Sequence, residues 1–76
     1  MAAAYILMNV QSGKVGKALN AVKRIQGVRS AHIVAGAYDI IGYVEAEDFE
    51  SLGQRIMFQV QSISGIRGTN TAVVFQ

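Results

Sequence analysis

The sequence predicts an α+β fold of the ferredoxin-like type, with element order βαββαβ and two helices covering one face of a four-stranded antiparallel sheet. The first observation is an internal repeat: Ile25-Gln26-Gly27-Val28-Arg29 recurs 38 residues later as Ile63-Ser64-Gly65-Ile66-Arg67. Two βαβ halves in series give this topology. The second observation is the length of 76 residues, which predicts a single domain over residues 1–76.

The first half of the chain is predicted to form a strand, a helix and a second strand. Ala3 to Val10 is rich in residues that favour strands. Lys14 to Ile25 has its apolar residues at helical spacing, and Gly27 is placed to end this helix. Val28 to Ala35 then has strand composition. The expected buried stripe of the helix is Val15, Ala18, Leu19, Val22 and Ile25.

The second half repeats this order after a turn at Gly36-Ala37-Tyr38-Asp39. Ile40 to Ala46 is predicted to form the third strand, and Asp48 to cap the second helix. Gly65 ends that helix, and Thr69 to Phe75 is expected to form the last strand. The expected buried stripe of the second helix is Phe49, Leu52, Ile56, Val60 and Ile63.

The strands are apolar on both faces, which predicts a dimer. A sheet that is wet on one side normally alternates apolar and polar residues. Two helices can cover one face, and no further element is left for the other. We therefore expect the sheets of two chains to pack together, as in dimeric α/β barrels, because leaving an apolar face in water is costly. The residues assigned to this interface are Tyr5, Leu7, Ile41, Tyr43, Val73 and Phe75.

Composition argues against several classes of site. The chain has no cysteine, one histidine (His32) and no ligand-spaced His/acid pair, so neither a metal site nor a cofactor is expected. His32 is interpreted as a packed side chain. The basic residues between Lys14 and Arg24 are interpreted as a solvated helix face, so no direct DNA binding is expected. Ala2 to Met8 is too short for a membrane span, and a cytoplasmic location is expected.

The segment Val34-Ala35-Gly36-Ala37-Tyr38-Asp39-Ile40-Ile41-Gly42-Tyr43-Val44 carries a family resemblance. It resembles the strand-loop-strand signature of the effector domain of leucine/asparagine-responsive (Lrp/AsnC) regulators, also called RAM. Ile25-x-Gly27-Val28 and Ile63-x-Gly65-Ile66, followed by Thr69 and Thr71, are similar to other landmarks of that domain. The resemblance covers essentially the whole chain. Since the chain starts at the first strand, we expect a stand-alone effector domain without a helix-turn-helix domain.

The resemblance implies a function that the residues alone do not show. Effector domains of this family dimerise through their sheets, assemble into octamers or decamers, and bind amino acids between dimers. Carried over by motif, the ligand-binding residues would be Gly36, Ala37, Tyr38, Asp39, Thr69 and Thr71. Gly36 would allow close approach to the backbone, and Asp39 would pair with an ammonium group. Taken without the resemblance, the same segment is simply a hairpin turn.

The expected function is that of a non-enzymatic, oligomeric, amino-acid-binding regulatory module that acts on transcription through a full-length Lrp/AsnC regulator. Two alternatives remain open. One is an interaction subunit that joins such a regulator without a ligand. The other is a small enzyme of the dimeric α/β-barrel superfamily, with His32, Tyr5 and Tyr43 as its available polar groups.

Overall fold

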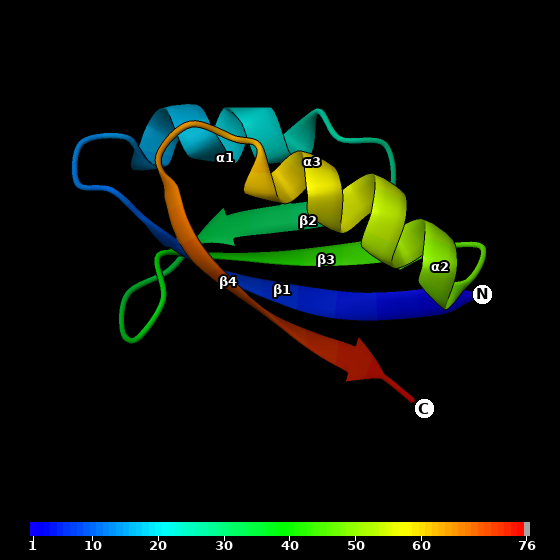
Figure 1. The fold of residues 1–76 in the computed structure, drawn as a ribbon. Coiled ribbons are helices and arrows are strands. Elements are labelled where there is room, and N and C mark those ends of the chain that lie inside the picture. Colours follow the sequence, from blue (N-terminus) through cyan, green and yellow to red (C-terminus); the bar gives the residue numbers. More distant parts are fainter. Residues whose placement is uncertain (76) are drawn as a thin grey trace.

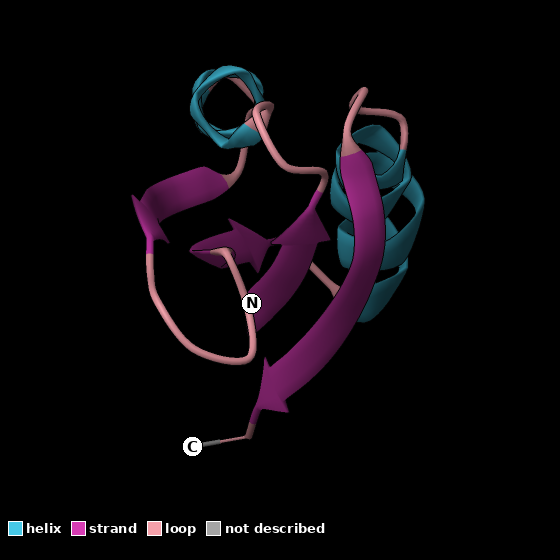
Figure 2. Ribbon diagram, turned by 90° about the vertical axis from the view of Figure 1, so that its left-hand side faces the viewer, coloured by secondary structure: helices cyan, strands magenta, loops and turns pink. Residues whose placement is uncertain are grey.

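The computed structural model describes residues 1–75 and has the predicted βαββαβ order, with the second helical region divided into three segments. The strands form one antiparallel sheet in the order β2-β3-β1-β4. Both helical regions lie on the same face of this sheet (Figures 1 and 2). The elements are β1 (Ala2–Val10), α1 (Val15–Lys23), β2 (Val28–Ile33), β3 (Ile40–Ala46), α2 (Phe49–Ser51), η1 (Leu52–Met57), α3 (Phe58–Gln61) and β4 (Ile66–Val74).

The core lies between the sheet and the two helical regions. Along the central strand β1, every second side chain from Ala2 to Val10 is buried, as the two-residue period of a strand requires. In α1, Ala18 and Val22 are buried and Leu19 packs against the core, which confirms the predicted stripe. No helix within residues 1–75 is long and apolar enough to cross a membrane.

The second helical region begins at its cap as predicted, and then differs from the prediction in two ways. Asp48 caps it as expected, since its carboxylate accepts a hydrogen bond from Ser51 N at 2.8 Å. This hydrogen bond lowers the pKa of Asp48. However, residues Leu52 to Met57 form a π-helix, and Phe49 is 58% exposed instead of buried. Phe49 occupies the first helical turn, ahead of the buried residues Leu52, Ile56 and Val60.

The strand ends also differ from the expected ones. β2 stops at Ile33, two residues early, and Val34 N instead donates to Asp39 O at 2.9 Å, which closes the loop to β3. β4 begins at Ile66 because a register shift at Asn9 and Val10 pairs Val10 with Ile66. Both ends are therefore set by pairing with other parts of the chain.

Candidate functional site

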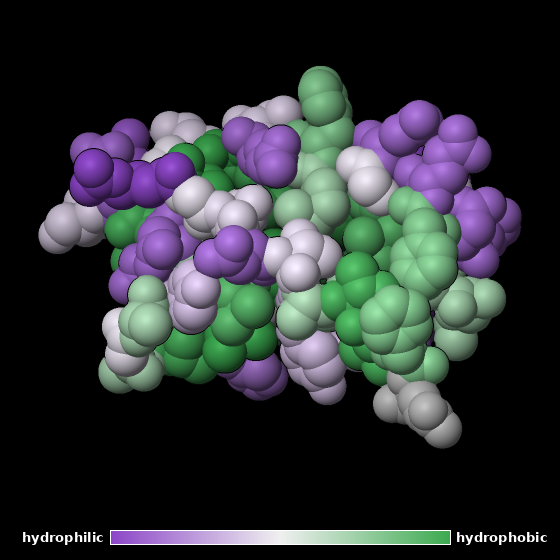
Figure 3. All heavy atoms as spheres, turned by 60° about the horizontal axis from the view of Figure 1, so that its bottom comes forward, coloured by the Kyte–Doolittle hydropathy of each residue, from purple (hydrophilic) through white to green (hydrophobic). Residues whose placement is uncertain are grey.

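The sheet face opposite the helices, called the open face below, carries a mixture of apolar and polar side chains. Figure 3 shows hydrophobic side chains reaching the surface on this side of the molecule. Strand register places Tyr5 beside Tyr43 and Leu7 beside Ile41, both pairs on the open face. Tyr5 is 47% exposed, while Leu7, Ile41 and Tyr43 are half-buried. These four predicted interface residues therefore form one contiguous surface.

A tyrosine pair and an ion pair are linked on this face. The rings of Tyr5 and Tyr43 lie 5.0 Å apart between centroids and are tilted by 51°. Tyr43 donates its hydroxyl to Glu45 Oε2 at 3.3 Å, and Arg29 Nε donates to Glu45 Oε1 at 2.9 Å. Desolvation and the adjacent Glu45 carboxylate raise the pKa of Tyr43, so its hydroxyl remains a donor.

The structure contradicts the predicted placement of Val73 on the open face. Val73 pairs with Ala4, whose side chain is buried beneath the helices, so Val73 belongs to the helix-facing side of the sheet. The β4 residues on the open face are Asn70, Ala72 and Val74, which pair with Leu7, Tyr5 and Ala3. Phe75 follows the last paired residue and is 91% exposed. The side of β4 that continues the open face is therefore that of Ala72 and Val74.

His32 also lies on the open face, where it pairs with Ile41. It is exposed in the subunit, so the expectation of a packed histidine is wrong for the single chain. Within residues 1–75, no cluster of three or more His, Cys, Asp or Glu side chains is arranged to hold a metal ion.

The loop from Val34 to Asp39 is tied to the end of β1. The Asp39 carboxylate accepts a hydrogen bond from Val10 N at 2.8 Å, and Asp39 N donates to Met8 O at 2.9 Å. Gly36 has a φ of +131° and is exposed, and no atom lies within 4 Å of the position of an added Cβ. Asp39 thus fixes the base of a loop whose tip is open to solvent.

The structure separates the six predicted ligand residues into two groups. Tyr38 hydroxyl accepts a hydrogen bond from Asn70 Nδ2 at 2.8 Å, so the loop contacts the open-face side of β4. Thr69 and Thr71 pair with Met8 and Ile6 and therefore point to the helix-facing side. Thr71 Oγ1 donates to Met57 Sδ at 3.5 Å. Within one subunit, the two threonines do not line the loop.

Sequence reasoning did not identify Asn70 as a partner of this loop. The available signal was a polar side chain between the two threonines, on the alternate face of the strand. Detecting it required the β1–β4 register, which is a long-range feature.

The sequence profile of the Lrp/AsnC ligand binding domain matches residues 3–76. The chain belongs to this family. Among curated relatives, the HTH-type transcriptional regulator AldR of Mycobacterium tuberculosis is 30% identical over 76 residues, which cover 96% of this chain and 42% of AldR. The chain therefore spans less than half the length of this relative. The family places the chain among domains of transcriptional regulators.

Solved structures support the same fold. The protein TTHA0845 from Thermus thermophilus matches with a TM-score of 0.93 and 25% identity, over 100% of this chain and 95% of that protein. The transcriptional regulator NMB0573 of Neisseria meningitidis, solved as a complex with L-Met, matches with a TM-score of 0.86. Its identity is 14%, and the match covers 99% of this chain and 50% of NMB0573. The NMB0573 match bears on the fold alone, and the Lrp/AsnC domain is thus ferredoxin-like here as in these structures.

Proposed function

We propose that this chain is a non-enzymatic regulatory module that dimerises through its open face and binds an amino acid at the loop from Gly36 to Asp39. The match to the Lrp/AsnC ligand binding domain over residues 3–76 is the observation that carries this proposal. The ligand class is carried over from the family resemblance of the Gly36–Asp39 segment. Transcription would be affected through a full-length regulator of the same family.

The dimer proposal rests on the open face. Within the subunit, Leu7, Ile41 and the Tyr5–Tyr43 pair cover the centre of the sheet without a helix over them. An apolar surface on a domain this small is stabilised by burial against a second copy. The Arg29–Glu45 pair gives this face a charged edge. Two copies packed face to face would place both apolar centres out of water.

The ligand proposal rests on the exposed tip of the loop. Gly36 and Ala37 are exposed, so a ligand can approach the backbone there. One carboxylate oxygen of Asp39 is bonded to Val10 N, and the other remains to accept from an ammonium group. Thr69 and Thr71 lie on the other side of the sheet, so they would reach such a ligand only from a neighbouring subunit. The site is therefore proposed to form between dimers.

Substitution of Asp39 separates its structural role from ligand recognition. Asp39→Ala removes the acceptor of Val10 N and should destabilise the protein by roughly 1–3 kcal/mol. Asp39→Asn keeps an acceptor oxygen, so it should fold with a smaller loss but bind amino acids more weakly. The measurements are chemical denaturation without ligand, and calorimetry with each of the twenty amino acids. At a hundredfold excess over Kd, a bound ligand should stabilise the wild type by about 2.7 kcal/mol.

Two outcomes would contradict amino-acid binding or the role of Asp39 in it. If no amino acid gives heat at millimolar concentration, the sensor function is rejected and an interaction subunit without ligand is favoured. If Asp39→Asn binds as tightly as the wild type, Asp39 does not recognise the ammonium group.

Assembly beyond the dimer is a further expected result. A ligand site between dimers requires contacts between dimers, so sedimentation at micromolar concentration should show rings of eight or ten chains. The added amino acid should change the distribution of species, because a ligand that bridges two dimers favours the assembled state. A dimer that persists at high concentration with every amino acid would remove the proposed interdimer site.

A further inference from the structure

A cleft lies at the opposite end of the sheet from the Gly36–Asp39 loop. It has a volume of about 610 Å³, within the range of roughly 300–1,000 Å³ found for small-molecule sites. It opens where α1 has ended and before β2 has begun, beside the last residues of β3 and the helical segments α2, η1 and α3. Its lining residues are Met1, Gln26, Gly27, Arg29, Glu45, Ala46, Glu47, Ser51, Arg55, Ile56 and Gln59.

The main chain at Gly27 shapes this cleft. Gly27 O accepts a hydrogen bond from Glu45 N at 2.9 Å, which holds the turn before β2 against the end of β3. β3 continues to Ala46, beyond the pair between Val28 and Val44. The sheet corner past this pair is not covered by β2. The cleft therefore exists because β3 extends farther than β2 at this corner of the sheet.

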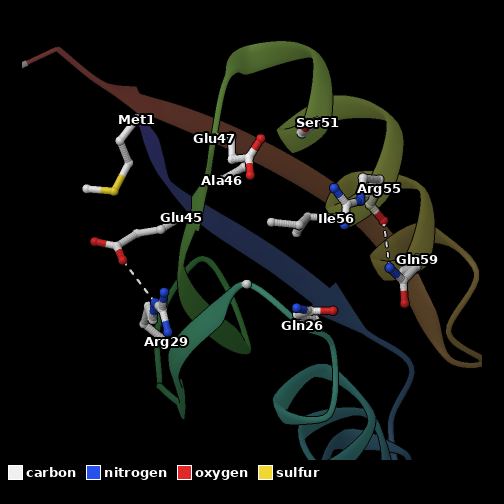
Figure 4. A pocket seen from close by; sticks show the side chains of 11 residues that line it. Met1, Gln26, Arg29, Glu45, Ala46, Glu47, Ser51, Arg55, Ile56 and Gln59 are labelled. Carbon is white, nitrogen blue, oxygen red and sulfur yellow. Dashed lines mark hydrogen bonds and ion pairs between the residues drawn. The ribbon is translucent and has the colours of Figure 1, made fainter.

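The π-helical segment supplies two neighbouring residues to the cleft. Arg55 and Ile56 both belong to η1, and Ile56 is 3% exposed while Arg55 is exposed. π-Helical turns occur frequently at functional sites. Figure 4 shows the Ile56 side chain in the middle of the lining residues, with Arg55 and Glu47 on one side and Gln26 across from them. An apolar floor is thus surrounded by polar groups.

Some charged side chains of the cleft are paired with each other, and others are not. Arg29 and Glu45 form an ion pair with an N–O distance of 2.9 Å. Within residues 1–75, neither Arg55 nor Glu47 has an ion-pair partner within 4.0 Å or a side-chain hydrogen bond. Gln59 donates its Nε2 to Arg55 O at 2.9 Å, which orders the helix next to the guanidinium. Arg55 and Glu47 are therefore the lining side chains whose charges are available to a ligand.

We propose that this cleft is a second ligand site, contained within one subunit, for the zwitterion of an aliphatic amino acid. Arg55 would bind the carboxylate, and Glu47 the ammonium group. Met1 and Ala46 would contact the aliphatic side chain, next to the nearly buried Ile56. The guanidinium fork is suited to a carboxylate, and charge-assisted hydrogen bonds are about twice as strong as neutral ones.

This site differs in location from the proposed site at the Gly36–Asp39 loop, and it does not require assembly. Arg55 belongs to the helix layer, so packing of two open faces leaves it accessible, while Arg29 and Glu45 of the cleft lie at the edge of the open face. The loop site, by contrast, is proposed to form between dimers. The two proposals can therefore fail separately.

The test uses the full chain labelled at isoleucine δ1-methyl groups and titrated with L-valine, followed by methyl NMR. The Ile56 methyl reports the cleft, and the methyl of Ile33, the exposed last residue of β2, reports the loop from Val34 to Asp39. L-Valine is expected to shift the Ile56 signal to saturation. Arg55→Gln should weaken this binding at least about tenfold, because a charge-assisted contact is lost. Arg67→Gln, at an exposed arginine outside the cleft, should leave it unchanged.

A second probe tests the ammonium contact. The acid 3-methylbutanoate has the carbon skeleton of L-valine without the ammonium group, so it should bind the wild type several-fold more weakly. In Glu47→Gln this difference should disappear. An Ile56 signal that does not move at millimolar L-valine overturns the cleft proposal, even if the Ile33 signal moves and supports the loop. Equal loss of binding in Arg55→Gln and Arg67→Gln also overturns it.

Discussion

Tyr43→Asp is expected to convert the proposed dimer into monomers. Tyr43 lies at the centre of the open face, beside Tyr5 and hydrogen-bonded to Glu45. In the proposed dimer, an aspartate at this position would be buried next to the Glu45 carboxylate, with no cation added to balance it. Because burial of an unpaired charge costs several kcal/mol, the dimer dissociation constant should rise by roughly a thousandfold. Analytical ultracentrifugation over a range of concentrations measures this change.

Two controls make the result specific to the open face. Tyr43→Phe keeps the ring contact with Tyr5 and removes only the hydroxyl, so it should remain dimeric. Phe58→Asp places the same charge at an aromatic residue that is 68% exposed in the helix layer, and it should also remain dimeric. A Tyr43→Asp variant that is dimeric with an unchanged melting temperature would show that the interface lies elsewhere.

Gly27→Ala is expected to cause a large loss of stability. Gly27 has a φ of +105°, a conformation that costs a residue with a side chain about 1–2 kcal/mol. An added Cβ would also lie 2.6 Å from Ile56 Cδ1 and 3.0 Å from Glu45 O. The Ile56 methyl group can move, but the Glu45 carbonyl oxygen is bound by the sheet. Overpacking of this kind typically costs a further 1–3 kcal/mol.

The expected total of about 3 kcal/mol corresponds to a decrease in melting temperature of roughly 15 °C for a domain of this size. Gly13→Ala is the matched control, because Gly13 has a φ of +85° and no atom within 4 Å of an added Cβ. Its loss should reflect the backbone conformation alone. Differential scanning calorimetry of both variants would separate the two contributions. Equal losses in Gly27→Ala and Gly13→Ala would mean that the Gly27 turn relaxes away from Ile56 and Glu45.

Local signals in the sequence were sufficient for much of the fold. The repeat of Ile-x-Gly-aliphatic-Arg predicted two matching helix–turn–strand junctions, and both exist, with Gly27 and Gly65 at positive φ. Asp48 was predicted as a helix cap because carboxylates accept from the free N–H groups of a first turn, and it has that role. These features depend on residues close together in the chain, so their physics is visible in the sequence.

The candidate site depended on contacts that local signals do not contain. Asp39 was assigned to a ligand from its place in a motif, whereas its carboxylate also holds Val10 N, a contact across 29 residues. The cleft around Ile56 arises where the ends of α1, β2, β3 and the second helical region meet, and no single motif marks it. Which polar groups remain free for a ligand is therefore decided after folding.

The last strand shows most directly what the sequence determined and what the tertiary structure decided. Alternation alone established that Ala72 and Val74 lie on one face and Val73 on the other, because successive side chains of a strand point in opposite directions. It did not determine which face is covered by helices. That choice follows from the pairing of Val73 with Ala4. A one-residue change in register exchanges the two faces of a strand, and register is set by long-range pairing.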